Sequence, residues 1–98
     1  MKYNLLISEE AKLDIFDAFL WYENQREDLG FEFEASPENG FHVVVNNPLA
    51  SQEKYDHVRV HFVERFPYGI HYIIDQDCIQ VFGVFHTSLD PINWKKRI

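Results

Sequence analysis

Arginines and histidines in the second half of the sequence are the side chains best suited to chemistry on a phosphate. Arg59, His61 and His71 fall in two segments of alternating polarity on either side of Phe66-Pro67-Tyr68-Gly69, and Arg65 lies beside this turn. If the two segments pair as a hairpin, the first three side chains can share one face of a sheet. Guanidinium and imidazole groups on one face can hold a phosphate and shuttle a proton, as RNA cleavage requires. The same pattern also fits the solvated side of a half-buried sheet, and by itself it favours that second interpretation.

His86 is a further candidate because it follows a nearly continuous apolar segment at residues 78–85 and precedes a loop. A strand fixes the backbone at its end, which suits a catalytic side chain. His86 is equally well placed to cap the loop through a hydrogen bond to Asp90. The basic run Lys95-Lys96-Arg97 can bind phosphate, complement the C-terminal end of a last helix or form a frayed tail, and the last two are favoured.

Metal and redox chemistry are not expected. His57 and His61 have a spacing that suits metal ligands on a helix, but they fall at the start of a strand and no zinc motif surrounds them. Cys78 is the one cysteine, which excludes an internal disulfide and a zinc site of several thiolates. It begins an apolar strand and is expected to be a small apolar filler. The sequence therefore predicts neither a metal nor a cofactor.

The composition is that of one small acidic domain. The 98 residues are 46% hydrophobic and 16% aromatic, enough for one core, and residues 1–98 are expected to form a single domain. Nine Lys and Arg against 16 Asp and Glu give a net charge of −7, which argues against a protein that coats nucleic acid or anionic membrane. Ten of these acids and three of the bases lie in residues 1–38. No signal peptide or membrane span is recognisable, so a cytoplasmic location is expected.

Hydrophobic periodicity and turn signals place the elements that must position these residues. Residues 3–7 predict a short strand, and Ser8 predicts the N-cap of an amphipathic helix that ends near residues 28–30. After a polar loop to about residue 56, three strands near 57–63, 70–74 and 78–85 are joined by short turns, and a short helix near 93–97 ends the chain. Short turns predict an antiparallel meander with the helix across its apolar face. The helix is expected to bury Ala11, Ile15, Ala18, Phe19 and Tyr22, widened by Leu13, Phe16 and Leu20, with Asp14, Asp17 and Glu23 on the solvent side.

Residues 31–47 allow two interpretations. Phe31-Glu32-Phe33-Glu34 alternates like a strand, Val43-Val44-Val45 favours a strand, and Ser36-Pro37-Glu38-Asn39-Gly40 between them suits a turn. A second helix fits the length, but Pro37 and Gly40 cost about 3 and 1 kcal/mol in a helix interior. The local pattern alone therefore favours a hairpin.

The motifs along almost the whole chain resemble those of the RelE/ParE superfamily of bacterial type II toxins, the plasmid-stabilisation type of small protein encoded beside an antitoxin. The resemblance implies an α+β fold with an N-terminal strand, a helical hairpin, a three-stranded antiparallel meander and a short C-terminal helix. It thus replaces the hairpin at residues 31–47 with a second helix, kinked or broken near Pro37 and Gly40. The motifs that carry it are Ser8-Glu9-Glu10-Ala11, Asn47-Pro48, Arg65-Phe66-Pro67-Tyr68, Ile70 and Tyr72, the apolar strand at 79–85, His86-x-x-x-Asp90-Pro91, Trp94 and Arg97.

The resemblance implies one of two activities. RelE-like members cut mRNA on the ribosome with lysines, arginines and a tyrosine. Here Arg59 and Arg65 lie in the strand region where the family carries basic residues, and His86 matches its histidine after the last strand. ParE-like members poison DNA gyrase and need no catalytic set of their own. Leu89 stands where many relatives carry arginine or lysine, and the net charge of −7 is unusual for such toxins. Both departures weaken the nuclease interpretation more than the ParE-like one.

Three hypotheses follow from the residues and the resemblance. The chain is a ParE-like toxin acting on a protein such as DNA gyrase, a ribosome-dependent mRNA endoribonuclease that uses His86 with Arg59 and Arg65, or a family member that only binds an antitoxin. Each implies a cognate antitoxin that lays a helix or strand along the chain. The acidic first half suits a basic peptide and repels an acidic one. A homodimer is left open, and no membrane partner is expected.

Overall fold

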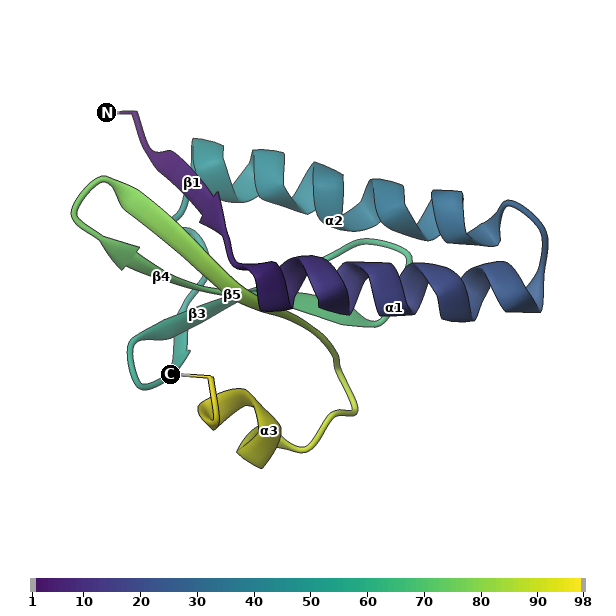
Figure 1. The fold of residues 1–98 in the computed structure, drawn as a ribbon. Helices are drawn as coiled ribbons and strands as arrows, with labels where there is room; N and C mark the ends of the chain where they lie inside the picture. The colour runs from purple at the N-terminus through teal and green to yellow at the C-terminus, as the bar shows by residue number, and fades with distance from the viewer. Residues whose placement is uncertain (1, 98) are drawn as a thin grey trace.

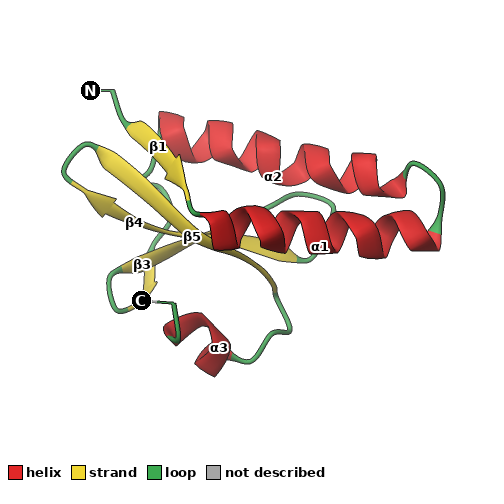
Figure 2. Ribbon diagram, in the orientation of Figure 1, coloured by secondary structure: helices red, strands yellow, loops and turns green. Residues whose placement is uncertain are grey.

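A five-stranded sheet carries two long helices on one face and a short C-terminal helix on the other (Figures 1 and 2). The computed structural model describes residues 2–97. The strand order is β1-β5-β4-β3-β2, with β1 parallel to β5 and the other neighbours antiparallel. The elements in chain order are β1 (Asn4–Ile7), α1 (Glu9–Gln25), α2 (Leu29–Asn46), β2 (Glu53–Tyr55), β3 (Val58–Phe62), β4 (Tyr68–Asp75), β5 (Cys78–His86) and α3 (Pro91–Lys95).

The predicted meander is confirmed as β3, β4 and β5, and the sheet extends beyond it on both sides. β1 pairs in parallel with β5, from Asn4 opposite Cys78 to Ile7 opposite Val81. β2 pairs with β3 within the segment expected to be a polar loop. Its three residues, two of them exposed, lack the apolar alternation that identifies a strand from sequence. Pairing with β3, rather than its own composition, makes this segment a strand.

The first helix begins where the sequence predicted and ends earlier. The Ser8 hydroxyl accepts the Ala11 N–H at 3.0 Å, which confirms the N-cap. α1 ends at Gln25 rather than near residues 28–30, because the backbone of Arg26 is extended. Asp28, with a positive φ of 68°, then turns the chain into α2. The Glu23 carboxylate accepts the backbone N–H groups of Asp28 and Gly30, each at 3.0 Å. A side chain of α1 thus satisfies free donors where α2 begins.

α2 is unbroken from Leu29 to Asn46, so residues 36–40 are neither the turn of a hairpin nor the break expected in a helix. Gly40 lies where α2 meets the sheet, and an added Cβ would lie 2.7 Å from Cδ1 of Ile70. Pro37 is fully buried, and the Ser36 hydroxyl donates to the Glu64 carbonyl at 2.8 Å. Packing of α2 against the sheet offsets the free-energy cost of placing Pro37 and Gly40 inside a helix.

α1 buries a narrower stripe than its composition suggested. Ala11 and Ala18 are buried, whereas Leu13, Phe16 and Leu20 are exposed. The helix meets the sheet through small side chains, and Leu13, Phe16 and Leu20 lie about half a turn away from that stripe, so they do not reach the core. The prediction that Leu13, Phe16 and Leu20 widen the buried face is wrong.

Candidate functional site

The sequence allowed Arg59, His61 and His71 to share one face of the sheet, and in the structure they do not. β3 and β4 do pair as a hairpin, but Val60 lies opposite His71 and His61 lies opposite Ile70. Opposite residues of an antiparallel pair share a face, so His61 and His71 lie on opposite faces of the sheet. His61 faces α2, where its ring lies 3.3 Å from the position of a Cβ on Gly40, and His71 faces α3. Strand register, which the spacing in sequence did not determine, separates the two imidazoles.

His71 is a buried, neutral histidine. Only 2% of its surface is exposed, and aromatic rings of Phe85 and Trp94 lie with centroids 4.7 and 4.9 Å from its own. Its Nδ1 lies 2.8 Å from the Tyr55 hydroxyl. Burial, with a smaller contribution from the positive charge of Arg97, lowers the pKa of His71 to about 4. An imidazole that stays neutral and enclosed serves the structure and does not exchange protons with a substrate.

A hollow of about 250 Å³ opens on the α3 side of the sheet, and His86 lines it. His86 caps the following loop through Ser88, whose N–H and hydroxyl lie 3.0 and 2.7 Å from His86 Nδ1. Since Nδ1 accepts the Ser88 N–H, the neutral ring carries its proton on Nε2. The sequence had suggested Asp90 as the partner of His86 in this loop. Asp90 instead accepts the Ile92 N–H at 3.0 Å and caps the start of α3. The hollow is lined by Lys54, Val60, Phe62, Gly69, His71, Phe85, His86, Thr87 and Trp94.

The two candidate arginines are engaged elsewhere. Arg59 Nη1 donates to the Ser51 carbonyl at 2.5 Å, and Nη2 lies 3.5 Å from the Glu53 carboxylate. It lies opposite Tyr72 on β4, whereas His86 lies opposite Tyr68. Four residues along a strand span about 13 Å, so Arg59 and His86 stand at opposite ends of this part of the sheet.

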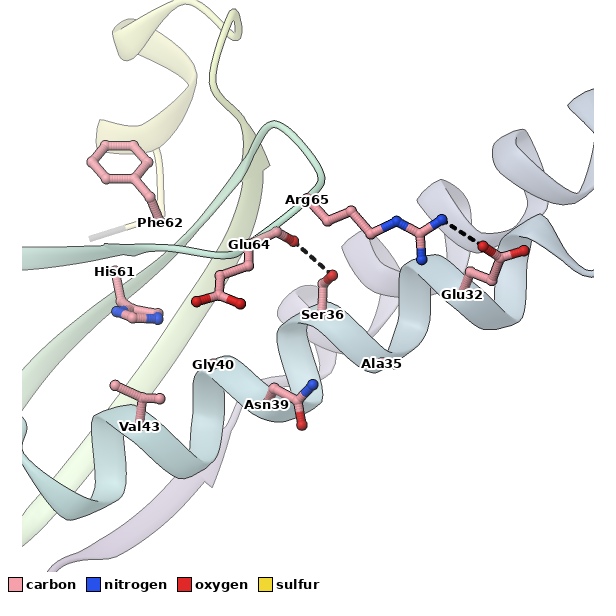
Figure 3. A pocket seen from close by; sticks show the side chains of 10 residues that line it. All are labelled: Glu32, Ala35, Ser36, Asn39, Gly40, Val43, His61, Phe62, Glu64 and Arg65. Atoms are coloured by element: carbon pink, nitrogen blue, oxygen red, sulfur yellow. Dashed lines mark hydrogen bonds and ion pairs between the residues drawn. The ribbon is translucent and has the colours of Figure 1, made fainter.

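Arg65 belongs to a different hollow, between α2 and β3 (Figure 3). Its Nη2 donates to Glu32 at 2.5 Å, and Glu32 also accepts from Arg26 at 3.0 Å. These two guanidinium groups hold the pKa of Glu32 below its usual value. Burial lowers the pKa of His61 in the same cleft, which Glu64 partly counters. The cleft has a volume of about 490 Å³ and is lined by Glu32, Ala35, Ser36, Asn39, Gly40, Val43, His61, Phe62, Glu64 and Arg65.

Arg97 ties the C-terminal segment to α1 and β5. Its Nη1 and Nη2 donate to the two oxygens of Asp14 at 2.6 and 2.9 Å, and Nη1 also donates to the Phe82 carbonyl at 3.1 Å. Asp14 in turn accepts the Val84 N–H at 3.0 Å. The sequence placed Asp14 on the solvent side of the helix, and nothing local could indicate an arginine 83 residues away. Of the basic run, Arg97 thus anchors α3 and is not free to bind a phosphate.

We expect Asp14→Asn to lower the free energy of unfolding by about 1–3 kcal/mol, because it removes a bidentate, charge-assisted pair that is mostly shielded from water. The matched control is Glu9→Gln, whose ion pair with Lys12 is exposed and contributes at most about 0.5 kcal/mol. Urea unfolding measures both variants. Equal effects would show that the Arg97–Asp14 pair does not anchor the C-terminal segment.

Neither a metal site nor a membrane-spanning helix is found in residues 2–97. No group of three or more His, Cys, Asp or Glu side chains in this range is placed to hold a metal ion. None of its helices is both long and apolar enough to cross a bilayer.

Comparison with known proteins is informative only at the level of structure. No protein-family model matches the sequence, and no curated protein matches it either. A chain of the chromosomal ParDE TA system from P. aeruginosa superimposes with a TM-score of 0.79 at 15% identity, over 89% of this chain and 98% of that one. The chain has the RelE/ParE-like fold. The second helix that the resemblance implied is confirmed as α2, Leu29–Asn46, where the local sequence favoured a hairpin.

Proposed function

We propose that this RelE/ParE-like chain is the toxin of a type II toxin–antitoxin module and inhibits growth in the ParE-like manner, through a protein target such as DNA gyrase. The similarity to a chain of a ParDE TA system supports the module. The choice of a protein target rests on one observation: Arg59, Arg65 and His86 each contact different residues and do not meet in one site.

RNA cleavage by side chains needs a base, an acid and a cation within hydrogen-bond reach of one phosphate. Here the Arg59 and Arg65 guanidinium groups are paired with Glu53 and Glu32, and Arg59 lies about 13 Å along the sheet from His86. Inhibition of a protein target needs only a complementary surface. An acidic chain with its candidate cations neutralised suits that second mode.

The second candidate function is ribosome-dependent mRNA cleavage, and one observation favours it. His86 shares the hollow on the α3 side with Lys54, whose Nζ lies 5.9 Å from the centroid of the Phe62 ring. A lysine and a histidine that line one hollow can hold a phosphate and supply a proton, and the aromatic walls can stack a base. The sequence missed Lys54 because it lies on β2, which was expected to be loop. A family member that only binds its antitoxin is the third candidate.

Controlled induction of the chain in bacteria tests the proposal. We expect growth arrest, altered plasmid topology and intact transcripts, and we expect His86→Ala to arrest growth as strongly as the original chain because no chemistry depends on it. His57→Ala, an exposed histidine away from the hollow, is the matched control. Transcript cleavage that disappears in His86→Ala and persists in His57→Ala would favour the endoribonuclease. Normal growth with folded protein would favour the chain that only binds an antitoxin.

A further inference from the structure

The hollow on the α3 side of the sheet has the size of a small aromatic molecule. Its volume is about 250 Å³. A cavity of about 150 Å³ is enough to hold benzene, whereas sites for drug-sized ligands begin at about 300 Å³. A single substituted ring or two fused rings therefore fit this space. The hollow is open beside α3, so such a molecule can enter it from solvent without a change in the fold.

Three aromatic side chains from different elements line the hollow: Phe62 on β3, Phe85 on β5 and Trp94 on α3. Phe85 is 5% exposed and belongs to the core, whereas Phe62 is 54% exposed. Gly69 keeps the space among them free, because an added Cβ would lie 2.8 Å from Cγ1 of Val60 and 3.5 Å from the Phe62 ring. Aromatic walls favour a planar ring, which gains stacked or edge-on contacts in addition to burial.

The charged and polar groups of the hollow suit an anion. Lys54 is exposed, its Nζ lies 5.9 Å from the centroid of the Phe62 ring, and it makes no ion pair within residues 2–97. The neutral His86 ring offers its Nε2 N–H as a second donor, because Nδ1 accepts from the following loop. None of the lining residues is Asp or Glu, and residues 39–98, which supply all of them, carry no net charge. One lysine matches one carboxylate better than a phosphate, which carries up to about two negative charges.

Trp94 adds a hydrogen-bond donor that the fold leaves unsatisfied. Its indole N–H is shielded from water and has no hydrogen-bond partner among residues 2–97. Buried donors in folded proteins are normally paired, and leaving one without a partner is unfavourable. Because Trp94 lines the hollow, this donor favours a ligand with an acceptor oxygen over a hydrocarbon of the same shape.

We propose that this hollow binds a small planar aromatic carboxylate, with its ring against Phe62 and Trp94 and its carboxylate against Lys54 and His86. Burial and ring contacts provide most of the affinity, and the carboxylate fixes the orientation of the ligand. The inference goes beyond the proposed function, since inhibition of a protein target requires no ligand in the hollow. It also differs from the endoribonuclease alternative, whose ligand would be an RNA phosphate.

Titration of the purified chain with naphthoate tests the proposal, with NMR of the two tryptophan indole N–H groups as the measurement. Trp94 lines the hollow and Trp21 lies on α1, so we expect the Trp94 signal to shift and the Trp21 signal to stay unchanged. Naphthoate should bind about tenfold more tightly than naphthylmethanol, which has the rings but no charge. It should also bind more tightly than its fully saturated analogue, which has the charge but no aromatic ring.

Paired variants separate the contribution of charge from that of the aromatic wall. Lys54→Gln should weaken naphthoate by about tenfold and leave naphthylmethanol unchanged. Lys96→Gln is its matched control, because this lysine is exposed at the end of α3 and does not line the hollow. Phe62→Ala should weaken both ligands, whereas Phe31→Ala, which removes a similarly exposed ring from α2, should weaken neither.

Each other outcome overturns the proposal in a distinct way. A Trp94 signal that stays unchanged at saturating naphthoate would show that the hollow binds no aromatic acid. Equal losses in Lys54→Gln and Lys96→Gln would reduce the binding to a general attraction of anions. Adenosine monophosphate that binds more tightly than naphthoate would assign the hollow to RNA and support the endoribonuclease. Growth arrest does not enter these titrations, so a chain that fails to stop growth would refute the proposed function and leave this inference standing.

Discussion

Phe33→Ala is expected to lower the free energy of unfolding by about 3–5 kcal/mol, the usual cost of deleting a fully buried phenyl ring. Phe33 joins α2 to the rest of the core. Its ring lies 5.2 Å from Tyr22 on α1, 5.4 Å from Phe66 in the β3–β4 turn and 5.0 Å from Tyr68 on β4. Removing it leaves a cavity between three elements, each of which is held in place by the others, so little of the space can be refilled.

Phe31→Ala is the matched control for Phe33→Ala. Phe31 has the same side chain two residues earlier in the same helix, but it is exposed, so we expect a change of less than about 1 kcal/mol. Urea unfolding with an unchanged slope measures both variants. Similar losses at the two positions would mean that the aromatic cluster around Phe33 does not hold α2 on the sheet.

The second large effect is a loss of stability at acidic pH that depends on His71. The unfolded chain binds a proton at His71 as the pH falls through about 6.5, whereas burial keeps the folded imidazole neutral down to about 4. Proton uptake between these values stabilises the unfolded state alone. The contribution is therefore complete above about pH 6.5 and lost as the pH falls towards 4, and the gap between the two pKa values corresponds to about 3 kcal/mol.

His71→Phe separates this contribution from that of the carboxylates, which also titrate near pH 4. Phenylalanine fills the space between Phe85 and Trp94 but takes up no proton. Between about pH 7 and pH 4 we expect the original chain to lose about 3 kcal/mol more than His71→Phe. Tyr55→Phe removes the hydrogen bond to Nδ1 and leaves the ring buried, so the steeper loss should persist in that variant. Parallel curves for the original chain and His71→Phe would contradict a depressed pKa.

The helical hairpin of α1 and α2 and the surroundings of His71 lie on opposite sides of the sheet (Figure 1). α3 packs beside His71 through contacts of Trp94 with Tyr55 and His71, and the Arg97–Asp14 pair holds this segment in place. On the opposite side, Leu13, Phe16 and Leu20 of α1 are exposed, and α1 holds five acids and one base. The hollow that His71 and His86 line is open beside α3, so a ligand can enter it with α3 in place.

Local sequence was sufficient to predict elements whose stabilising contacts lie within one short segment of the chain. Ser8 caps α1, as predicted, because its side-chain oxygen reaches an N–H three residues on. Turn residues between apolar segments predicted β3, β4 and β5, because short connections force neighbouring antiparallel strands. The resemblance supplied α2, which the local pattern of residues 31–47 did not favour.

Tertiary structure alone decided the features that join distant segments. β2 is a strand only because β3 lies beside it, and α2 continues through Pro37 and Gly40 because the sheet packs against it. Register placed His71 opposite Val60 and so separated it from His61, a choice that a shift of one residue would reverse. The amino-acid sequence by itself determined β1, α1 with its Ser8 cap, the three strands of the meander and the acidic charge of the first half. The site was decided by pairing and packing across the sheet, since a contact between residues far apart in the chain leaves no pattern in either segment alone.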